Sequence, residues 1–249
     1  MTENKQDRYS RQILLPELGR EGQEKLSRAS AVVIGVGGLG SVISQTLVRA
    51  GVGFVRVVDR DVLEWSNLHR QLLYEEEDVR QGLPKAEAAA RKLAKMNSDV
   101  KVEARQVSVG RDSVEELISD VSVVLDGTDN IESRFVLNDA CVKHDKPWVY
   151  GGAVGTTGLV MTIVPGRGPC LSCLMESPPP AGSVPNCSTV GVLAPAPIVV
   201  AALQATEAIK LLIGDESGAG RLLQCDMWKG RFTRMEVPRR KDCPVCNKG

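Results

Sequence analysis

Two segments of the chain carry the residue types that hold a nucleotide. One is a glycine turn, GVGGLG at residues 35–40, and the other is SNLHRQ at residues 66–71, which follows Asp59 and Asp61. A glycine turn with an acidic residue about twenty positions later is typical of a dinucleotide site. A hydride-transfer enzyme has no use for the asparagine, arginine and glutamine of the second segment, whereas such donors clamp a triphosphate. The combination indicates ATP rather than NAD.

Four of the seven cysteines form two C-x-x-C pairs, Cys170/Cys173 and Cys243/Cys246. Two thiolates on a tight turn can both bind one tetrahedral zinc ion. The pairs stand much farther apart than in a zinc ribbon, so the fold must bring them together. A redox C-x-x-C normally opens a helix after a strand, and neither pair clearly has that context. We therefore predict a shared zinc site, with two unrelated pairs of reduced thiols as the alternative.

The composition excludes several kinds of partner. The 31 basic and 31 acidic side chains cancel, so no global charge attracts nucleic acid or an anionic membrane. Aromatic residues make up only 4% of the chain, too few for platforms that stack bases. No apolar run reaches the roughly 18 residues that span a bilayer, and residues 1–7 are too polar for a signal peptide. We expect a soluble, cytoplasmic protein.

Alternating strand and helix signals must position the nucleotide residues. The apolar and helically spaced segments predict strands at 31–34, 54–58, 100–109 and 121–125, and helices at 39–50, 83–96 and 114–118. This order predicts a Rossmann-like α/β fold with a mostly parallel central sheet and helices on both faces. Ligands bind at the carboxyl ends of such strands, where the glycine turn, Asp59 and Asp129 would meet.

The second half of the chain has a different pattern. It predicts a helix at 194–213 and strands at 148–152, 157–164, 222–227 and 232–237. The sheet would thus continue into a mixed or antiparallel part that leads to the zinc site. A proline-rich segment at 177–191, which contains Cys187, predicts a mobile surface loop. We interpret residues 1–249 as a single domain, with an N-terminal helical arm (1–30), a nucleotide-binding half (31–150) and a second half (151–249).

These motifs together resemble those of the MoeB/ThiF/HesA adenylyltransferases, the bacterial relatives of ubiquitin-activating enzymes. The resemblance runs nearly end to end, through RYSRQ at 8–12, the glycine turn, Asp59 and Asp61, SNLHRQ, Lys85, DGTDN at 126–130, Cys187, QATEAIK at 204–210 and both C-x-x-C pairs. It implies an enzyme that joins ATP to the C-terminal Gly-Gly carboxylate of a small ubiquitin-like sulfur carrier of the ThiS or MoaD kind. The products would be an acyl-adenylate and pyrophosphate, and the adenylate would then accept sulfur to become a thiocarboxylate.

The resemblance also implies roles for individual residues. ATP would be bound by Gly35, Gly37, Gly38, Gly40, Asp59, Asp61, Asn67, Arg70, Gln71, Lys85, Asp129 and Asn130. The catalytic residues would be Arg11, Arg70, Lys85, Asp129 and, as a thiol linked to the carrier, Cys187. Asp129 would hold Mg²⁺, and Arg11 would reach into the site of the neighbouring subunit, so we expect a homodimer. Residues 151–249 would bind the carrier and hold a structural zinc ion, and a separate protein would donate the sulfur because no rhodanese-like extension follows Gly249.

Several alternatives stay open. Asp61 could cap the segment that follows it, and Gln71 could be a structural hydrogen-bonding residue. The cysteine that matches Cys187 links covalently to the carrier in the thiamine branch and is dispensable in the molybdopterin branch. An NAD-dependent oxidoreductase would explain only the glycine turn, and a non-catalytic scaffold would have lost its polar site residues. The pathway of the carrier, whether thiamine, molybdopterin, cysteine or another sulfur route, does not follow from the sequence.

Overall fold

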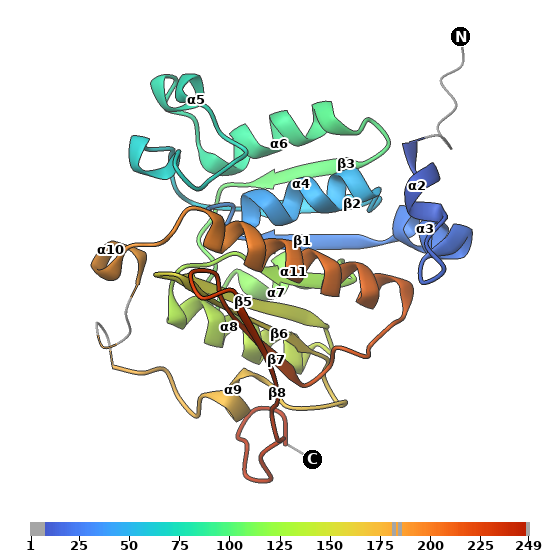
Figure 1. Ribbon diagram of the computed structural model, residues 1–249, viewed down its shortest axis with the longest axis vertical. Helices are drawn as coiled ribbons and strands as arrows, with labels where there is room; N and C mark the ends of the chain where they lie inside the picture. The colour runs from blue at the N-terminus through green and yellow to red at the C-terminus, as the bar shows by residue number, and fades with distance from the viewer. Residues whose placement is uncertain (1–7, 181–182, 184–185, 248–249) are drawn as a thin grey trace.

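One mixed sheet runs through the chain in the computed structural model, which describes residues 8–180, 183 and 186–247. The described residues form eight strands in the order β3-β2-β1-β4-β5-β6-β7-β8 (Figure 1). The strands are β1 (Ser30–Ile34), β2 (Phe54–Val58), β3 (Lys101–Arg105), β4 (Val123–Asp126), β5 (Trp148–Val154), β6 (Thr157–Ile163), β7 (Arg221–Asp226) and β8 (Arg231–Glu236). Strands β1 to β5 pair in parallel, and β5 to β8 pair antiparallel. The predicted change from a parallel to an antiparallel sheet is confirmed.

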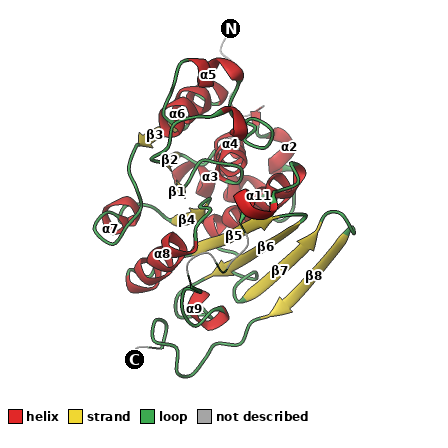
Figure 2. Cartoon of the chain, turned by 90° about the vertical axis from the view of Figure 1, so that its left-hand side faces the viewer, coloured by secondary structure: helices red, strands yellow, loops and turns green. Residues whose placement is uncertain are grey.

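Helices cover both faces of the parallel part, as predicted (Figure 2). One core lies under α4 (Gly40–Ala50), α6 (Lys85–Met96) and α11 (Pro195–Ile213), and the other under α7 (Val114–Ile118) and α8 (Ile131–Lys143). Successive side chains of a strand point to opposite faces. In β1, accordingly, Ala31 and Val33 enter the first core, and Val32 and Ile34 enter the second. Burial on both faces explains why the parallel strands read as unbroken apolar runs.

Several element bounds differ from the prediction. The strand expected at 100–109 ends at Arg105, because its neighbour β2 ends at Val58 and the residues beyond have no strand to pair with. The loop expected at 177–191 contains a short helix, α10 (Cys187–Val190), before which Asn186 accepts a hydrogen bond from the Thr189 N–H. Short elements η1 (Trp65–Asn67), α5 (Glu76–Arg80) and α9 (Leu171–Leu174) were not predicted.

Helix α11 is the one helix, among the residues that the structure describes, with the length and composition to cross a membrane. This corrects the expectation that no segment reaches that length. The helix packs on β5 and β6 and contacts α4. Its buried residues follow helical spacing along one face: Ala196, Pro197, Val200, Ala201, Gln204, Ala205 and Ala208. The apolar composition of α11 therefore serves the core of the domain.

The two ends of the sheet carry different segments. Helices α2 (Ser10–Ile13) and α3 (Gly19–Arg28) lie where the parallel strands begin, since α3 leads directly into β1. The Gln12 side chain fastens α2 there by donating to the carbonyl of Ala50, the last residue of α4. In Figure 1, α5 and α10 lie at the opposite end. The carboxyl ends of β1, β2 and β4 are therefore free to form a site.

Candidate functional site

A cavity of about 1080 Å³ lies at the carboxyl ends of β1, β2 and β4. It is large enough for a nucleotide, since ligand pockets usually measure about 300–1,000 Å³. The predicted site residues that line it are Gly35, Gly37, Gly38, Asp59, Asp61, Asn67, Arg70, Gln71, Lys85, Asp129, Asn130 and Cys187. The structure thus brings together side chains from three βα connections and from the α10 segment.

The glycine turn opens one wall of this cavity. Gly35 follows β1 with φ at +84°, which favours glycine, and the turn leads into α4 at Gly40. Within the described part of the chain, the backbone N–H groups of Gly37, Gly38 and Leu39 meet no acceptor. Free N–H groups at the start of a helix, together with the helix dipole, make a binding site for phosphate.

Gly40 does not line the cavity but makes the turn possible. A Cβ atom at this position would lie 1.8 Å from the carbonyl oxygen of Gly35. Side chains are therefore excluded here, and α4 can start directly against the end of β1. The role of Gly40 is close packing beneath the nucleotide site rather than contact with the ligand.

Asp59, at the end of β2, is locked in place by the backbone. Its carboxylate accepts the N–H of Val36 at 2.9 Å and the N–H of Asp61 at 2.9 Å. Burial raises the pKa of Asp59. These two N–H groups and the charge of Lys85 lower it, but they offset only part of the rise. The carboxylate thus ties the glycine turn to β2 and faces the cavity, where a sugar hydroxyl could donate to it.

Lys85 is not the solvated lysine that a helix start often carries. It is 7% exposed, and its Nζ atom lies 3.0 Å from the Asp61 carboxylate. The backbone N–H of Lys85 also donates to the carbonyl of Asp61 at 2.9 Å. Asp61 therefore holds the first residue of α6 twice, which argues against its being a simple cap of its own segment.

The SNLHRQ segment wraps the same wall in a 3₁₀ turn. The Asn67 side chain is buried and accepts the N–H of Glu64, so it shapes its own turn as well as lining the cavity. Arg70 donates to the carbonyl of Ser66. Gln71 is 3% exposed, and its Oε1 atom has no partner among the described residues. A buried amide oxygen without a donor is costly and calls for a ligand or a water.

Asp129 follows β4 and is the one predicted catalytic carboxylate in the cavity. It is exposed and forms no ion pair with any residue that the structure describes. Its neighbour Asn130 caps α8 by accepting the N–H of Ser133 at 2.9 Å. Asn130 therefore has a structural task at the cavity wall, while Asp129 is free for a cation.

Two further cavity residues, Arg134 and Tyr150, were missed by sequence analysis. Arg134 in α8 forms an ion pair with Asp126, the last residue of β4, with 3.1 Å between Nε and Oδ2. Its guanidinium carbon lies 5.2 Å from the centre of the Tyr150 ring. Neither residue stands in a motif that names its chemistry. The available signal was position: Arg134 comes one helical turn after the Asn130 cap.

Cys187 lies at the edge of the cavity, with its Sγ atom 3.5 Å from the carbonyl oxygen of Ala153. Burial raises the pKa of its thiol, the charge of Arg70 lowers it and that of Asp129 raises it again. The structure therefore brings the cysteine to the site without activating it.

Arg11 is the predicted catalytic residue that the structure does not bring to the cavity of its own chain. It belongs to α2, at the amino ends of the strands, where it is exposed (Figure 1). The sheet separates it from Asp129 and Lys85. Arg11 therefore does not line the cavity of its own chain.

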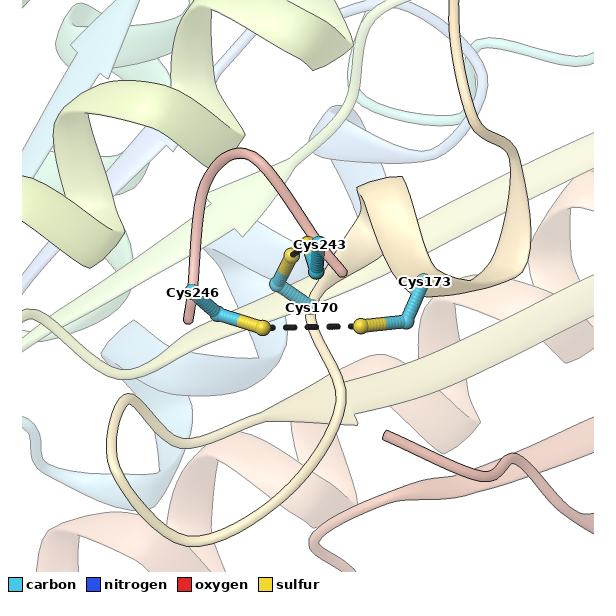
Figure 3. Close-up of side chains that lie close together, drawn as sticks. All are labelled: Cys170, Cys173, Cys243 and Cys246. Atoms are coloured by element: carbon cyan, nitrogen blue, oxygen red, sulfur yellow. Dashed lines mark hydrogen bonds between the residues drawn. The ribbon is translucent and has the colours of Figure 1, made fainter. Parts of the chain in front are cut away.

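The side chains of the two C-x-x-C pairs, Cys170/Cys173 and Cys243/Cys246, lie close together (Figure 3). Cys170 Sγ lies 3.6 Å from Cys243 Sγ, and Cys173 Sγ lies 3.4 Å from Cys246 Sγ. All four sulfur atoms lie within 4.8 Å of one another. Tetrahedral zinc with bonds of about 2.3 Å places its sulfur ligands about 3.8 Å apart. The cluster fits this geometry, although Cys170 precedes a short helix, α9, which the sequence did not reveal.

The cavity has the chemistry that ATP requires. The start of α4 and the side chains of Arg70 and Lys85 supply positive charge for the phosphates. Asp59 supplies an acceptor for the ribose, and Gln71 carries an unpartnered buried oxygen. Asp129 adds a carboxylate of the kind that holds Mg²⁺ beside a nucleotide. These residues fit ATP and a divalent cation together.

Comparisons with known proteins agree with this geometry. A model of the ThiF family matches residues 9–245. The chain is 46% identical to the sulfur carrier protein ThiS adenylyltransferase of Bacillus subtilis, over 96% of the chain and 71% of that relative. It is 45% identical to the sulfur carrier protein adenylyltransferase of Thermus thermophilus, over 98% of the chain and 92% of that relative. The crystal structure of E. coli MccB with ATP superposes with a TM-score of 0.84 at 25% identity, covering 98% of this chain and 75% of MccB.

Proposed function

Because this chain belongs to the ThiF family, we propose that it is a sulfur carrier protein adenylyltransferase. It uses ATP to activate the C-terminal carboxylate of a small carrier protein. The observation that carries this function is the cavity itself, which Asp129, Arg70, Lys85 and the start of α4 line together; among the described residues, Asp129 forms no ion pair and the N–H groups at the start of α4 meet no acceptor. The Bacillus subtilis and Thermus thermophilus relatives both bear the name of this activity.

The reaction joins two anions that repel each other, and the positive groups of the cavity can offset this repulsion. A carboxylate oxygen of the carrier attacks the α-phosphorus of ATP, the bond to the bridging oxygen of the β-phosphate breaks, and pyrophosphate leaves with those electrons. Little proton transfer is needed, so catalysis rests on neutralising charge and holding the reactants in line. Arg70, Lys85 and the start of α4 would contact the phosphates, and Asp59 would fix the ribose.

Asp129 would hold Mg²⁺, which would neutralise the triphosphate and favour departure of pyrophosphate. Its exposed carboxylate is unpaired among the described residues and lines the same cavity as Arg70 and Lys85. Carboxylates together with substrate phosphates are the usual ligands of Mg²⁺ in nucleotide sites.

The carrier tail would enter beside β5, where Gly152, Ala153 and Val154 line the cavity with Cys187. A Gly-Gly end suits this wall because it brings no side chains. The ThiS adenylyltransferase at 46% identity favours a ThiS-like carrier, and a separate protein would supply the sulfur. Of the alternatives, NAD-dependent hydride transfer leaves Arg70, Lys85 and Asp129 without a task.

Zinc would occupy the four-cysteine cluster as a structural ion, since four thiolates close its coordination and leave no open position. Arg11 would complete the site of a second copy, because it lies at the far end of its own sheet. A homodimer would then be part of the mechanism. Seven cysteines without a disulfide among the described residues suit a reducing compartment such as the cytoplasm.

Pyrophosphate exchange tests this function. The purified protein should incorporate labelled pyrophosphate into ATP only with Mg²⁺ and with a carrier ending in Gly-Gly. Asp129→Asn should abolish exchange, because it removes the carboxylate that would hold the cation, while carrier binding stays nearly unchanged.

Asp139→Asn is the matched control. Asp139 is an exposed carboxylate of α8, the helix that follows Asp129, and it does not line the cavity. It should exchange pyrophosphate like the unaltered protein. Exchange that proceeds without Mg²⁺ or without a carrier would refute the assignment.

A further inference from the structure

Arg134 forms a buried ion pair at the floor of the cavity. Its Nε atom lies 3.1 Å from Oδ2 of Asp126, whose side chain is fully buried, and the arginine side chain itself is 14% exposed. Burial raises the pKa of Asp126, and the charge of Arg134 lowers it. Taking two charges out of water is costly, and apolar side chains of the same volume often stabilise a core better than such a pair. The pair therefore calls for an explanation other than stability.

The same guanidinium group joins α8 to two other segments, the end of β4 with its following turn and strand β5. Beyond Asp126 at the end of β4, Nη2 donates to the carbonyl of Thr128 at 2.9 Å and to the carbonyl of Gly151 at 3.0 Å. Thr128 belongs to the turn after β4, and Gly151 belongs to β5. The planar fork of an arginine can hold such acceptors in one fixed arrangement, which a lysine cannot.

This arrangement fixes the backbone on the amino-terminal side of Asp129. Thr128 donates to Oδ1 of Asp126 through its N–H at 2.9 Å and through its hydroxyl at 2.7 Å. On the other side, Asn130 is held as the cap of α8. Asp129 has no ion pair among the described residues, so its direction depends on the backbone that Arg134 clamps.

We propose that Arg134 is a positioning residue that fixes the backbone beside Asp129 and so sets the direction of its carboxylate for cation binding. This inference rests on the proposed function, because Asp129 is the residue that would hold Mg²⁺ on the triphosphate. Arg134 does not touch the reacting atoms. It acts through its hydrogen bonds to the carbonyls of Thr128 and Gly151, which hold the backbone beside Asp129.

The test measures a cation directly, apart from activity. Mn²⁺ replaces Mg²⁺, α,β-methylene-ATP replaces ATP, and electron paramagnetic resonance gives the Mn²⁺ affinity of the complex. Arg134→Lys keeps the charge but lacks the planar fork that holds the three acceptors in one arrangement. It should weaken Mn²⁺ binding about tenfold, the loss expected for one charge-assisted hydrogen bond.

Arg56→Lys is the matched control, because it makes the same arginine-to-lysine change in a buried ion pair elsewhere in the molecule. Arg56 is the fork of another ion pair, with Asp120 at 2.6 and 2.9 Å, and it does not line the cavity. This variant should lower the melting temperature without changing the Mn²⁺ affinity. If Arg134→Lys likewise lowers only the melting temperature, Arg134 is merely structural and the proposal is wrong.

Two more variants keep the test decisive. In an Asp129→Asn background, Arg134→Lys should cause little further loss of Mn²⁺ affinity, whereas additive losses would show that Arg134 does not act through Asp129. If Arg134→Lys fails to fold, Asp126→Asn replaces it, because the amide oxygen can still accept both Thr128 bonds while the ion pair is lost. It should weaken Mn²⁺ binding in the same direction, and an unchanged affinity would overturn the proposal. Carrier-dependent exchange by the unaltered protein decides the proposed function separately.

Discussion

At the residue scale, Cys187 shows how proximity and reactivity can differ. Its thiol lies at the cavity edge beside Ala153, yet burial raises its pKa above that of an ordinary cysteine. A nucleophilic cysteine is normally activated by a lowered pKa, because the thiolate is the reactive form. In the free protein, Cys187 is therefore a thiol at neutral pH, and a covalent role would require the bound carrier or nucleotide to change its surroundings.

Alkylation kinetics test the protonation state of Cys187. Since its pKa is raised, the thiolate fraction at pH 7.5 is lower than the roughly one tenth of a free cysteine. Iodoacetamide should therefore modify Cys187 more slowly than a model peptide thiol, and the rate should keep rising with pH beyond the point where the peptide levels off. Peptide mass spectrometry measures the extent at this residue. Faster labelling than the model peptide at neutral pH would mean that the thiol is activated after all.

The sequence could predict those site residues that stand in motifs, and no others. The glycine turn, Asp59 and Asp129 follow strands whose apolar runs are plain, so their meeting at one edge of the sheet is a consequence of parallel pairing. Arg134 and Tyr150 reach the same cavity from the start of α8 and from the middle of β5. Their contacts depend on how α8 packs on the sheet, which local sequence does not specify. Asn67 and Asn130 also have a double task, since each shapes its own turn.

At the scale of elements, the cysteine cluster connects α9 with the C-terminal loop. The C-x-x-C spacing predicted that the two pairs would share an ion. Because the pairs are far apart along the chain, the sequence did not show which elements bring them together. The structure brings both to the second core, where Cys170 and Cys243 are buried beside Leu222 of β7. Burial raises the pKa of the Cys243 thiol, but the N–H groups of Cys246 and Val245 and the neighbouring thiols together lower it to about 7.

Removal of one ligand tests the metal and its contribution together. Cys243→Ser should reduce the zinc content from one ion per chain toward zero, because the hydroxyl is a poor ligand. The C-terminal loop would lose its attachment to α9, and the melting temperature should fall by roughly 5–10 °C. Elemental analysis and thermal unfolding measure the two effects.

Cys141→Ser is the control, since Cys141 is a buried thiol of α8 outside the cluster. It should lower the melting temperature by burying a hydroxyl but leave the zinc content unchanged. Freshly prepared, reduced protein without any metal would rule out the zinc site.

Elements were predicted correctly where the spacing of apolar residues reflects their burial. The prediction failed where strand pairing sets the end of an element. Strand β1 and helices α7 and α11 have the expected positions because their apolar spacing matches their burial. Strand β3 ends early because β2 offers no further partner. Helix α10 escaped prediction because prolines precede it, whereas a local hydrogen bond from the Thr189 N–H to Asn186 is enough to start one turn.

At the scale of the whole molecule, the position of Arg11 poses the question of assembly. Helix α2 is fixed at the amino ends of the strands by Gln12, which donates to the Ala50 carbonyl at 3.0 Å. The exposed leucines Leu14 and Leu15 follow directly after α2. A short arm with a cation and exposed apolar side chains is suited to contact with a second copy. A single sequence does not encode which surface of that copy receives it.

Complementation between defective chains tests whether Arg11 acts across a dimer. Arg11→Ala and Asp129→Asn chains should each be inactive, but a re-associated mixture should regain pyrophosphate exchange. In a mixed dimer, the site with an intact Asp129 receives the intact Arg11 of its neighbour, while the other site has both defects. Random pairing makes half of the dimers mixed, with one working site of two, so activity should return to roughly a quarter of the unaltered level.

Each parent taken alone through the same dissociation and re-association should stay inactive, which excludes refolding artefacts. If Arg11 acts within its own chain, every site of a mixed dimer retains a defect. A mixture as inactive as its parents would therefore end the shared-site hypothesis.

Strand β8 is an exposed edge strand of the sheet. All six of its residues are exposed, and among the described strands β7 is its one hydrogen-bonded neighbour (Figure 2). Such a strand should open locally at little cost while the parallel core stays closed, and free strand edges tend to pair with other molecules. Here the strand is tethered on both sides, by the hairpin turn after Asp226 and by the cysteine cluster that begins at Cys243. A detached β8 would therefore stay within reach of β7, which favours re-pairing with its own sheet over pairing with a neighbouring molecule.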